Sequence, residues 1–244
     1  MSAAEGKMRG LFVTGTDTGV GKTAVCAALA LFLRSRGVRV GVMKPVETGV
    51  EDPAGLGADG RLLAWAAGVP EDAAAISPYR LRAPLAPSVA AEEEGVRIDV
   101  TSLLEGVRQA ARNCEYLLVE GAGGLMVPLR GGYLMADFAR DLGLPLLVVA
   151  RTALGTINHT LLTIFAARNL ELPVAGFILN GMPAAADAAS ACAPHALASL
   201  ASADLLGVLP WIEGDEQSRS EVLAREIARL PTLGWLERAL GIKE

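Results

Sequence analysis

The sequence predicts an α/β fold built on a mostly parallel sheet with helices on both faces. Apolar runs without polar alternation recur along the 244 residues, which is typical of strands buried on both faces. Segments with helical spacing of apolar residues separate these runs, as expected for parallel strands joined by helices. An apolar content of 52% is enough for a substantial core. We expect a single domain over residues 1–244, with residues 1–8 forming a flexible N-terminal tail.

The overall charge gives no indication of a nucleic-acid partner, since it is −5 and the chain has no basic run. The polar start lacks the apolar core of a secretory signal, and no uncharged apolar run suggests a membrane span. We therefore expect a cytoplasmic protein that binds neither nucleic acid nor membrane. Cys26, Cys114 and Cys192 are far apart and odd in number, so we expect three small buried side chains in a reducing compartment.

A phosphate-binding loop is the strongest signal in the chain. The stretch LFVTGTDTGVGKTAVCAALALFL (Leu11 to Leu33) predicts an apolar strand, a glycine-bearing turn and a long apolar helix. A strand that enters a tight turn before a helix points free backbone N–H groups, and the positive end of the helix dipole, at one place. We therefore expect an anion to bind there.

The residue types in this turn suit a nucleotide phosphate. Gly19 and Gly21 let the backbone approach phosphate oxygens closely. Lys22 can reach the β and γ phosphates, and the Thr23 hydroxyl can bind Mg²⁺. Five residues, rather than the usual four, separate Gly15 from Gly21. An ordinary turn rich in small residues is the alternative, but the apolar strand and helix around GKT favour a P-loop NTPase-like domain.

Apolar runs and helical spacing of apolar residues in the rest of the chain predict alternating strands and helices. Further strands are expected at residues 38–46, 116–124, 144–150, 172–180 and 205–211. Helices are expected at residues 56–67, 98–113, 157–169, 187–202 and 216–230. Pro78, Pro84 and Pro87 lie within residues 77–89, so we expect irregular surface chain there.

Polar residues follow several of the predicted strands. In parallel α/β sheets, ligands bind beyond the carboxyl ends of the strands. The polar strand ends are residues 14–23, 44–48, 120–124, 180 and 210–213. We expect these segments to converge on one site.

Glu120 and Lys44 are the strongest candidates for chemistry. Glu120 ends an apolar strand, where phosphate-loop proteins place a carboxylate that holds Mg²⁺; the alternative is a solvated acid. Lys44 precedes Pro45 at the end of another strand and could neutralise charge on a transferring phosphoryl group; the alternative is a surface lysine. Asp59 on its own indicates only a helix cap.

The roles of four other residues stay open on spacing alone. Asn180 and Trp211 could contact a nucleotide base, although an asparagine at a strand end is more often a turn residue. His159 and His195 could be either structural or functional.

The motifs, taken together and in order, resemble those of the dethiobiotin synthetase family. They are VTGTDTGVGKT (13–23), KPVETG (44–49), VEGAGG (119–124), LGTINHTLLT (154–163) and LLGVLPW (205–211). The resemblance runs from Leu11 to about Gln217, and the longer phosphate loop is this family's own pattern. It implies an ATP-dependent cyclo-ligase of biotin biosynthesis.

The resemblance implies a three-step reaction in which ATP is a co-substrate and Mg²⁺ is the metal. CO₂ adds to one amine of 7,8-diaminononanoate to give a carbamate. The carbamate attacks the γ-phosphate and forms a carbamic-phosphoric anhydride, and the second amine then displaces phosphate to close the ring of dethiobiotin. No covalent enzyme intermediate is needed, so catalysis would rest on positioning and charge neutralisation.

The resemblance also implies roles for individual residues. The catalytic residues would be Lys44, which bridges carbamate and γ-phosphate, and Lys22. ATP would be bound by Gly19, Val20, Gly21, Lys22, Thr23, Ala24, Asp59, Glu120, Gly121, Ala122, Gly123, Asn180, Gly181, Pro210, Trp211, Ile212 and Gln217. Mg²⁺ would be bound by Thr23, Asp59 and Glu120. The substrate would be contacted by Thr18, Thr48, Gly155 and Asn158.

Family resemblance further implies a homodimer that receives the carboxylate tail of the diamine across the subunit interface, near residues 155–158. Two positions depart from the family pattern. Gly19 stands where some relatives carry a glutamate in the loop. The tyrosine that some relatives offer to the substrate tail has no clear counterpart, and His195 is the nearest residue.

The alternative function is a MinD/ParA-like switch ATPase that acts as a partner-binding module. Such proteins place a second lysine early in the loop, where this chain has Thr16 and Asp17. They often end in a basic amphipathic helix, whereas residues 216–240 are mixed in charge. Both differences count against this alternative.

Overall fold

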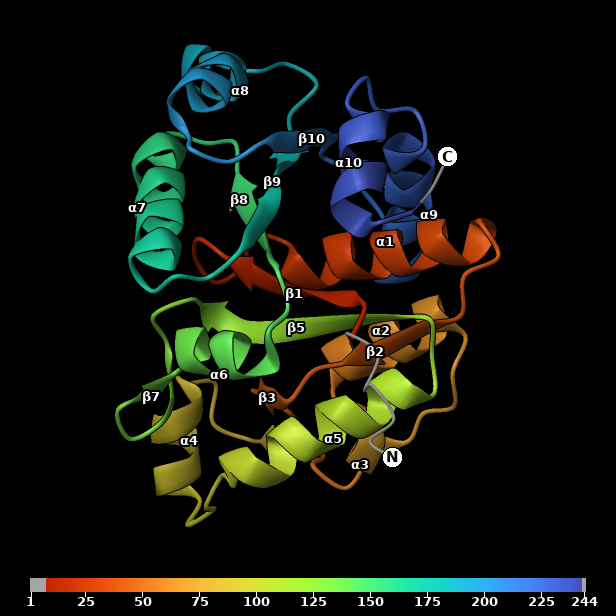
Figure 1. Ribbon diagram of the computed structural model, residues 1–244, viewed down its shortest axis with the longest axis vertical. Helices are drawn as coiled ribbons and strands as arrows, with labels where there is room; N and C mark the ends of the chain where they lie inside the picture. The colour runs from red at the N-terminus through yellow and green to blue at the C-terminus, as the bar shows by residue number, and fades with distance from the viewer. Residues whose placement is uncertain (1–7, 243–244) are drawn as a thin grey trace, which may run out of the picture.

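The computed structural model describes residues 8–242 and contains a six-stranded sheet with the strand order β10-β9-β8-β1-β5-β2. Its strands are β1 (Gly10–Gly15), β2 (Val40–Met43), β5 (Tyr116–Gly124), β8 (Leu146–Arg151), β9 (Val174–Met182) and β10 (Leu205–Pro210). Every pairing within this sheet is parallel, which confirms the predicted fold class. Figure 1 shows β1 between β8 and β5. Of the expected tail, residues 1–7 lie outside the described residues.

Helices cover both faces of this sheet. One face carries α1 (Lys22–Ser35), α2 (Ala58–Ala67), α9 (Glu216–Ile227) and α10 (Leu233–Leu240). The other carries α4 (Pro87–Glu93), α5 (Val100–Arg112), α6 (Met135–Leu142), α7 (Thr156–Asn169) and α8 (Ala188–Leu200). The short helix α3 (Ala73–Ile76) packs beside α2. Asp99, Asp187 and Asp215 cap α5, α8 and α9 by accepting backbone N–H groups, which explains where these helices begin.

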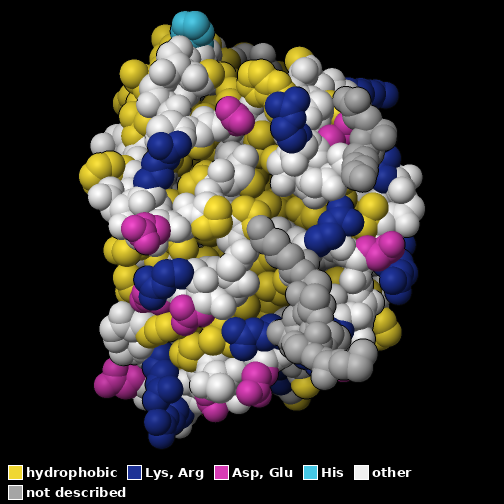
Figure 2. Space-filling model, in the orientation of Figure 1, with side chains coloured by type: hydrophobic (Ala, Val, Ile, Leu, Met, Phe, Trp, Pro, Cys, Tyr) yellow, Lys and Arg dark blue, Asp and Glu magenta, His cyan; other side chains and the backbone are white. Residues whose placement is uncertain are grey.

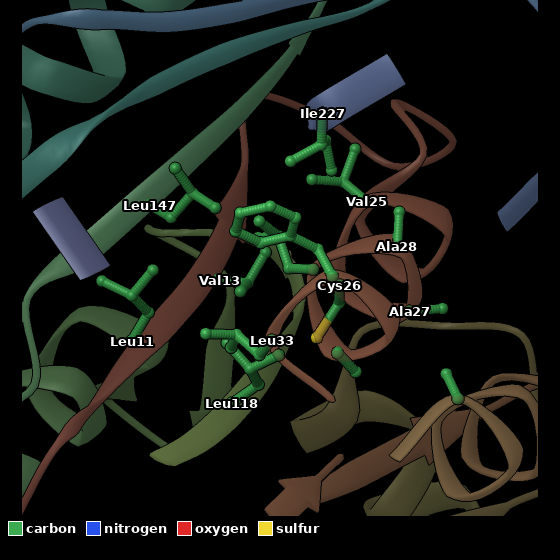
Figure 3. Packing of buried hydrophobic residues seen from close by; sticks show 14 of the residues in the cluster. Leu11, Val13, Val25, Cys26, Ala27, Ala28, Leu33, Leu118, Leu147 and Ile227 are labelled. Atoms are coloured by element: carbon green, nitrogen blue, oxygen red, sulfur yellow. The ribbon is translucent and has the colours of Figure 1, made fainter. Parts of the chain in front are cut away.

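Strand β1 shows why the apolar runs of the sequence lack polar alternation. Leu11 and Val13 pack in one core together with Ile227 of α9 (Figure 3). Phe12, between them, faces the opposite core, where its ring meets the ring of Phe138 edge to face with centroids 6.2 Å apart. Because both faces of the strand are buried, successive residues alternate between two cores rather than between core and solvent.

The strand expected at residues 38–46 is wrong in its second half. Strand β2 ends before Lys44, and the chain then forms β3 (Val46–Thr48), which pairs with β4 (Tyr79–Leu81) in a separate sheet. Pro45 has no N–H with which to continue the ladder, and Lys44 donates its own N–H to the Ile76 carbonyl at 2.8 Å. The break directs the chain that follows β2 away from the main sheet.

The irregular chain expected at residues 77–89 is also wrong, because this segment contains β4 and the start of α4. Pro87 lies in the first turn of α4, where its missing N–H would have no intrahelical partner. The hairpin of β6 (Pro128–Arg130) and β7 (Tyr133–Leu134) was not predicted, and neither were α3, α6 and α10. These elements are too short for a clear period to show in the sequence.

On the face drawn in Figure 2, basic and acidic side chains are interspersed among hydrophobic ones. No helix within residues 8–242 has the length and hydropathy that crossing a bilayer requires.

The three cysteines differ in exposure. Cys26 is buried and Cys114 is half-buried, but Cys192 is exposed on α8, so the expectation that all three are buried is wrong for Cys192.

Candidate active site

The phosphate loop joins β1 to α1. Gly19 and Gly21 have φ angles of 69° and 88°, in the left-handed region that glycine adopts without strain. A Cβ on Gly21 would lie 2.2 Å from the amide nitrogen of Asn180. That amide donates a hydrogen bond to the Val20 carbonyl at 3.1 Å. Asn180 of β9 therefore holds the loop, and Gly21 leaves the space that it needs.

Lys44 comes directly after β2, and Glu120 lies in the neighbouring strand β5, one position beyond the last β2–β5 pair, Met43 and Val119. Lys44 Nζ lies 2.5 Å from Glu120 Oε1 and 2.6 Å from Asp59 Oδ2. The Thr23 hydroxyl donates to the same Glu120 oxygen at 2.9 Å. Lys44 is only 5% exposed and Glu120 is fully buried, which excludes the readings of a surface lysine and a solvated acid. Four segments far apart in sequence thus meet at one point.

The charges of this cluster stabilise one another. Burial lowers the pKa of Lys44, but the carboxylates of Glu120 and Asp59 outweigh burial and leave that pKa above its usual value. Burial raises the pKa of Asp59, yet the Lys44 ammonium brings it below its usual value. Burial also raises the pKa of Glu120, against the opposing charge of Lys44. Lys44 and Asp59 are therefore an ionised pair, and the Lys44 ammonium partly offsets the rise that burial and the Asp59 charge cause in the pKa of Glu120.

Lys22 lies at the start of α1 and is also buried. Its ammonium donates to the Asp17 carbonyl at 3.3 Å. Burial lowers the pKa of Lys22, while the charge of Glu120 opposes that effect. The Asp17 carboxylate pairs with Arg151 at the end of β8, so the tip of the loop is tied to a neighbouring strand.

Glu47 is a buried acid that sequence reasoning missed. It accepts hydrogen bonds from the backbone N–H groups of Asp59 at 2.9 Å and Gly60 at 3.2 Å. These groups belong to the first turn of α2, and the preceding Gly57 has no side chain to cap them. A Cβ on Gly57 would lie 2.1 Å from Glu47 Oε1. Glu47 of β3 thus caps α2 from outside and positions Asp59 beside Lys44.

The oxygen atoms of this cluster fit a Mg²⁺ ion. Within residues 8–242, no group of three or more His, Cys, Asp and Glu residues could hold a metal by itself. Glu120 Oε2 is buried without a hydrogen-bond partner. The Thr23 hydroxyl donates to Glu120, and the Asp59 carboxylate is joined to the same acid through Lys44, which contacts both. Few protein oxygens suffice for Mg²⁺, because it keeps waters and substrate phosphates as ligands.

Two adjoining cavities open at the phosphate loop. The phosphate-loop cavity has a volume of about 350 Å³ and is lined by Thr18, Gly19, Gly21, Lys22, Thr23, Ala24, Lys44, Val46, Thr48, Asp59, Leu62, Ala122, Gly123, Glu216 and Arg219. The strand-end cavity has a volume of about 300 Å³ and is lined by Gly19, Val20, Gly21, Ala24, Arg151, Thr152, Ala153, Asn180, Gly181, Pro210, Trp211, Ile212, Arg219 and Leu223. Most of the predicted site residues line one of these cavities.

Five predicted residues line neither cavity. Glu120 and Gly121 are buried in β5, and Glu120 is reached only through its contacts with Lys44 and Thr23. Gly155 and Asn158 are exposed at the start of α7, and Gln217 is exposed at the start of α9. Glu216, one position before Gln217, lines the phosphate-loop cavity instead. Arg219 in the same helix lines both cavities. Sequence reasoning missed Glu216 and Arg219, because a polar helix start does not reveal which of its residues face the loop.

Comparisons with known proteins find relatives along most of the chain. The profile of a family described as an AAA domain matches residues 9–218. The ATP-dependent dethiobiotin synthetase of Anaeromyxobacter dehalogenans (strain 2CP-C) is 44% identical over 221 residues, covering 91% of this chain and 98% of that protein. The enzyme of the same name from Thermodesulfovibrio yellowstonii is 41% identical over 213 residues, covering 83% and 89%. Among solved structures, the cell division ATPase MinD of Pyrococcus furiosus has a TM-score of 0.56 at 20% identity, with 91% and 99% covered, and this likeness concerns the fold alone.

Proposed function

We propose that this chain, which belongs to the ATP-dependent dethiobiotin synthetase family, converts 7,8-diaminononanoate, CO₂ and ATP to dethiobiotin, ADP and phosphate. Membership of the family makes it an ATP-dependent ligase of biotin synthesis. The observation that carries the finer proposal is the buried contact of Lys44 with Glu120 and Asp59 beside the phosphate loop. A cation fixed there suits a reaction in which a substrate oxygen attacks the γ-phosphate.

The proposed reaction has three steps. One amine of the diamine bonds to the carbon of CO₂ and loses a proton, which gives a carbamate. A carbamate oxygen bonds to the γ-phosphorus of ATP while the bond from that phosphorus to ADP breaks, which gives a carbamic-phosphoric anhydride. The second amine bonds to the carbonyl carbon and loses a proton, and phosphate leaves as the ring closes.

Lys44 and Lys22 would stabilise the charge that moves in the second step. Lys44 is held by two carboxylates before any substrate arrives, so its ammonium needs little reorganisation when charge develops. We assign it to contact both the carbamate and the γ-phosphate. We assign Lys22 to the β and γ oxygens. Its hydrogen bond to the Asp17 carbonyl is long at 3.3 Å, so a phosphate oxygen can readily replace that acceptor.

Thr23, Asp59 and Glu120 would hold Mg²⁺. The unpartnered Glu120 Oε2 supports this assignment, because a buried carboxylate oxygen is costly without a cation or a donor. When bound, Mg²⁺ neutralises charge on the transferred phosphoryl group. Glu47 contributes indirectly, since it fixes the first turn of α2 and with it the carboxylate of Asp59.

ATP would extend across both cavities. We propose that its phosphates lie in the phosphate-loop cavity and its adenine in the strand-end cavity. The lining that the cavities share along the loop, Gly19, Gly21 and Ala24, supports one continuous ligand. Asn180, Gly181 and residues 210–212 would contact the base. Thr18 and Thr48 line the phosphate-loop cavity and would contact the diamine.

A homodimer would bring α7 into the site. Gly155 and Asn158 line neither cavity of their own chain. They would therefore contact substrate bound in the cavity of a partner subunit. Helix α7 and the turn before it carry Leu154, Phe165 and Leu162, which are 86%, 66% and 56% exposed. A partner subunit would cover this apolar surface. The dimer and a cytoplasmic location are both parts of the proposal.

A coupled assay of ADP release, run with and without 7,8-diaminononanoate and bicarbonate, tests the proposed function. We expect ADP release to require both compounds, and mass spectrometry to find dethiobiotin in an amount equal to the ADP. ADP release that ignores the diamine would favour a switch ATPase of the MinD/ParA kind. No contact within the described residues favours that alternative at present.

A further inference from the structure

Arg219 is the charged side chain common to both cavities. The residues that line the phosphate-loop cavity and also the strand-end cavity are Gly19, Gly21, Ala24 and Arg219. The first three belong to the loop and the start of α1, whereas Arg219 comes from α9. Helix α9 packs against α1, so Arg219 faces the loop from across the junction of the two cavities.

The Arg219 side chain points towards the loop because of the face of α9 on which it lies. Leu223 and Ile227 are four and eight positions later, and both are buried in the core that contains α1. Residues four apart lie on one face of a helix, so Arg219 continues this inward face at the end nearest the loop. Leu223 also lines the strand-end cavity, which agrees with that placement. Arg225, six positions after Arg219, is exposed on α9.

The guanidinium of Arg219 has no charged partner in the part of the chain that the structure describes. Its Nε is buried without a hydrogen-bond acceptor. None of the ion pairs formed within residues 8–242 includes it. The contrast with Lys44 is direct, because Lys44 lies within 2.6 Å of two carboxylate oxygens. A buried donor without an acceptor is unfavourable, so this group is suited to an anionic ligand.

We propose that Arg219 binds the α-phosphate of the nucleotide. The inference rests on the proposed function, which places the β and γ phosphates at Lys22 and the base in the strand-end cavity. In such a ligand the α-phosphate and sugar lie between these ends, at the junction that Arg219 faces. A guanidinium presents its N–H groups in a planar fork that matches phosphate oxygens. Arg219 thereby distinguishes nucleotides from nucleosides.

Calorimetric titration of ADP, AMP and adenosine into four proteins tests this assignment. The proteins are the wild type, Arg219→Ala, Arg219→Lys and Arg225→Ala. The Arg225→Ala control removes the same charge from the same helix outside the cavities. We expect Arg219→Ala to weaken the binding of ADP and AMP about tenfold or more and to leave the affinity for adenosine within about twofold of the wild-type value. The affinity of Arg219→Lys for ADP and AMP should lie between those of the wild type and Arg219→Ala, because lysine keeps the charge and loses the planar fork of N–H groups. Arg225→Ala should match the wild type.

Two results would overturn the assignment. Equal ADP affinity in the wild type and Arg219→Ala would show that the guanidinium does not contact the phosphate. Equal losses for ADP and adenosine would place its contact on the base or sugar instead. Failure of the wild type to bind any of the three ligands would overturn the proposed nucleotide site as a whole, which is a different outcome. Thermal unfolding of each variant checks that it is folded, and Arg219→Lys provides the comparison if Arg219→Ala is not.

Discussion

The two cavities of the site differ in the groups that line them. Beside the phosphate loop, Lys44, Asp59 and Glu120 are interlocked by contacts of 2.5 and 2.6 Å. The strand-end cavity has no such cluster: its polar side chains are the Asn180 amide, the Thr152 hydroxyl and the guanidinium groups of Arg151 and Arg219, and Trp211 is 63% exposed. The first region is fixed by a buried cluster of ion pairs before a ligand binds, whereas the second has no buried ion pair among its lining residues. Substitutions should therefore affect the rate in the first region and affinity in the second.

The difference also has a structural cause. Buried charges are tolerated only when they are paired, and removing one partner leaves the other unpaired at a cost of about 3–5 kcal/mol. Losing one neutral hydrogen bond costs only about 0.5–1.5 kcal/mol. The phosphate-loop cavity should thus be far more sensitive to single changes than the strand-end cavity.

Lys44→Ala is expected to have the largest effect. It removes the cation at the transferring phosphoryl group, so turnover in the ADP assay should fall by about 10²- to 10³-fold or more. Glu120 would be left buried without its ion-pair partner, so the free energy of unfolding in urea should fall by about 3 kcal/mol. ADP should still bind, because the loop and the base contacts remain. Turnover at the wild-type rate would remove the role assigned to Lys44.

Glu47→Ala tests whether the cap on α2 positions the charged cluster. Two backbone N–H groups, those of Asp59 and Gly60, would lose their acceptor, so the free energy of unfolding should fall by about 1–3 kcal/mol. The Mg²⁺ concentration for half-maximal activity should rise, because Asp59 would be less well placed. Glu47→Gln keeps one acceptor oxygen, so its free energy of unfolding and its Mg²⁺ requirement should lie between those of the wild type and Glu47→Ala. A loss of stability with an unchanged Mg²⁺ requirement would limit Glu47 to a purely structural role.

Gly57→Ala tests the same cap from the side of the helix. The added Cβ would lie 2.1 Å from Glu47 Oε1, and such overpacking typically costs about 1–3 kcal/mol. Gly55→Ala is the matched control, since a Cβ there would meet nothing within 4 Å. We expect the thermal midpoint to fall for Gly57→Ala and to stay near the wild-type value for Gly55→Ala. Equal midpoints for the two variants would contradict the tight contact with Glu47.

Asn180→Ala should have the smallest effect and should act on affinity. It removes the amide that donates to the Val20 carbonyl, so the KM for ATP should rise by about five- to tenfold with kcat nearly unchanged. Asn169→Ala, which alters an exposed amide on α7, is the control. A loss in kcat as large as that of Lys44→Ala would erase the distinction between the two cavities.

Much of the charged cavity could be predicted from sequence. The strand, turn and helix around GKT appear in order, and β5 occupies the residues expected for it, Tyr116–Gly124. The rule that ligands bind at the ends of parallel strands also leads to Lys44 and Glu120. Strong apolar runs make these strands visible, and an acid or a lysine after such a run is conspicuous.

The remaining parts depend on contacts that spacing does not reveal. Strands β3 and β4 have three residues each and show no period. Glu47 resembles a solvated acid in sequence, and only its hydrogen bonds to the first turn of α2 make it a cap. Arg219 resembles any arginine on a polar helix until the packing of α9 on α1 turns it towards the loop. Sequence spacing therefore locates groups at strand ends better than groups supplied by a neighbouring helix.

A crystal structure with Mg²⁺, a non-hydrolysable ATP analogue and 7,8-diaminononanoate tests the central claim most directly. The claim predicts one continuous nucleotide across both cavities. Its γ-phosphate should lie between Lys22 and Lys44, and one amine of the diamine should lie on the far side of Lys44. A nucleotide in one cavity and a diamine in a separate pocket, with Lys22 and Lys44 pointing to different ligands, would contradict it.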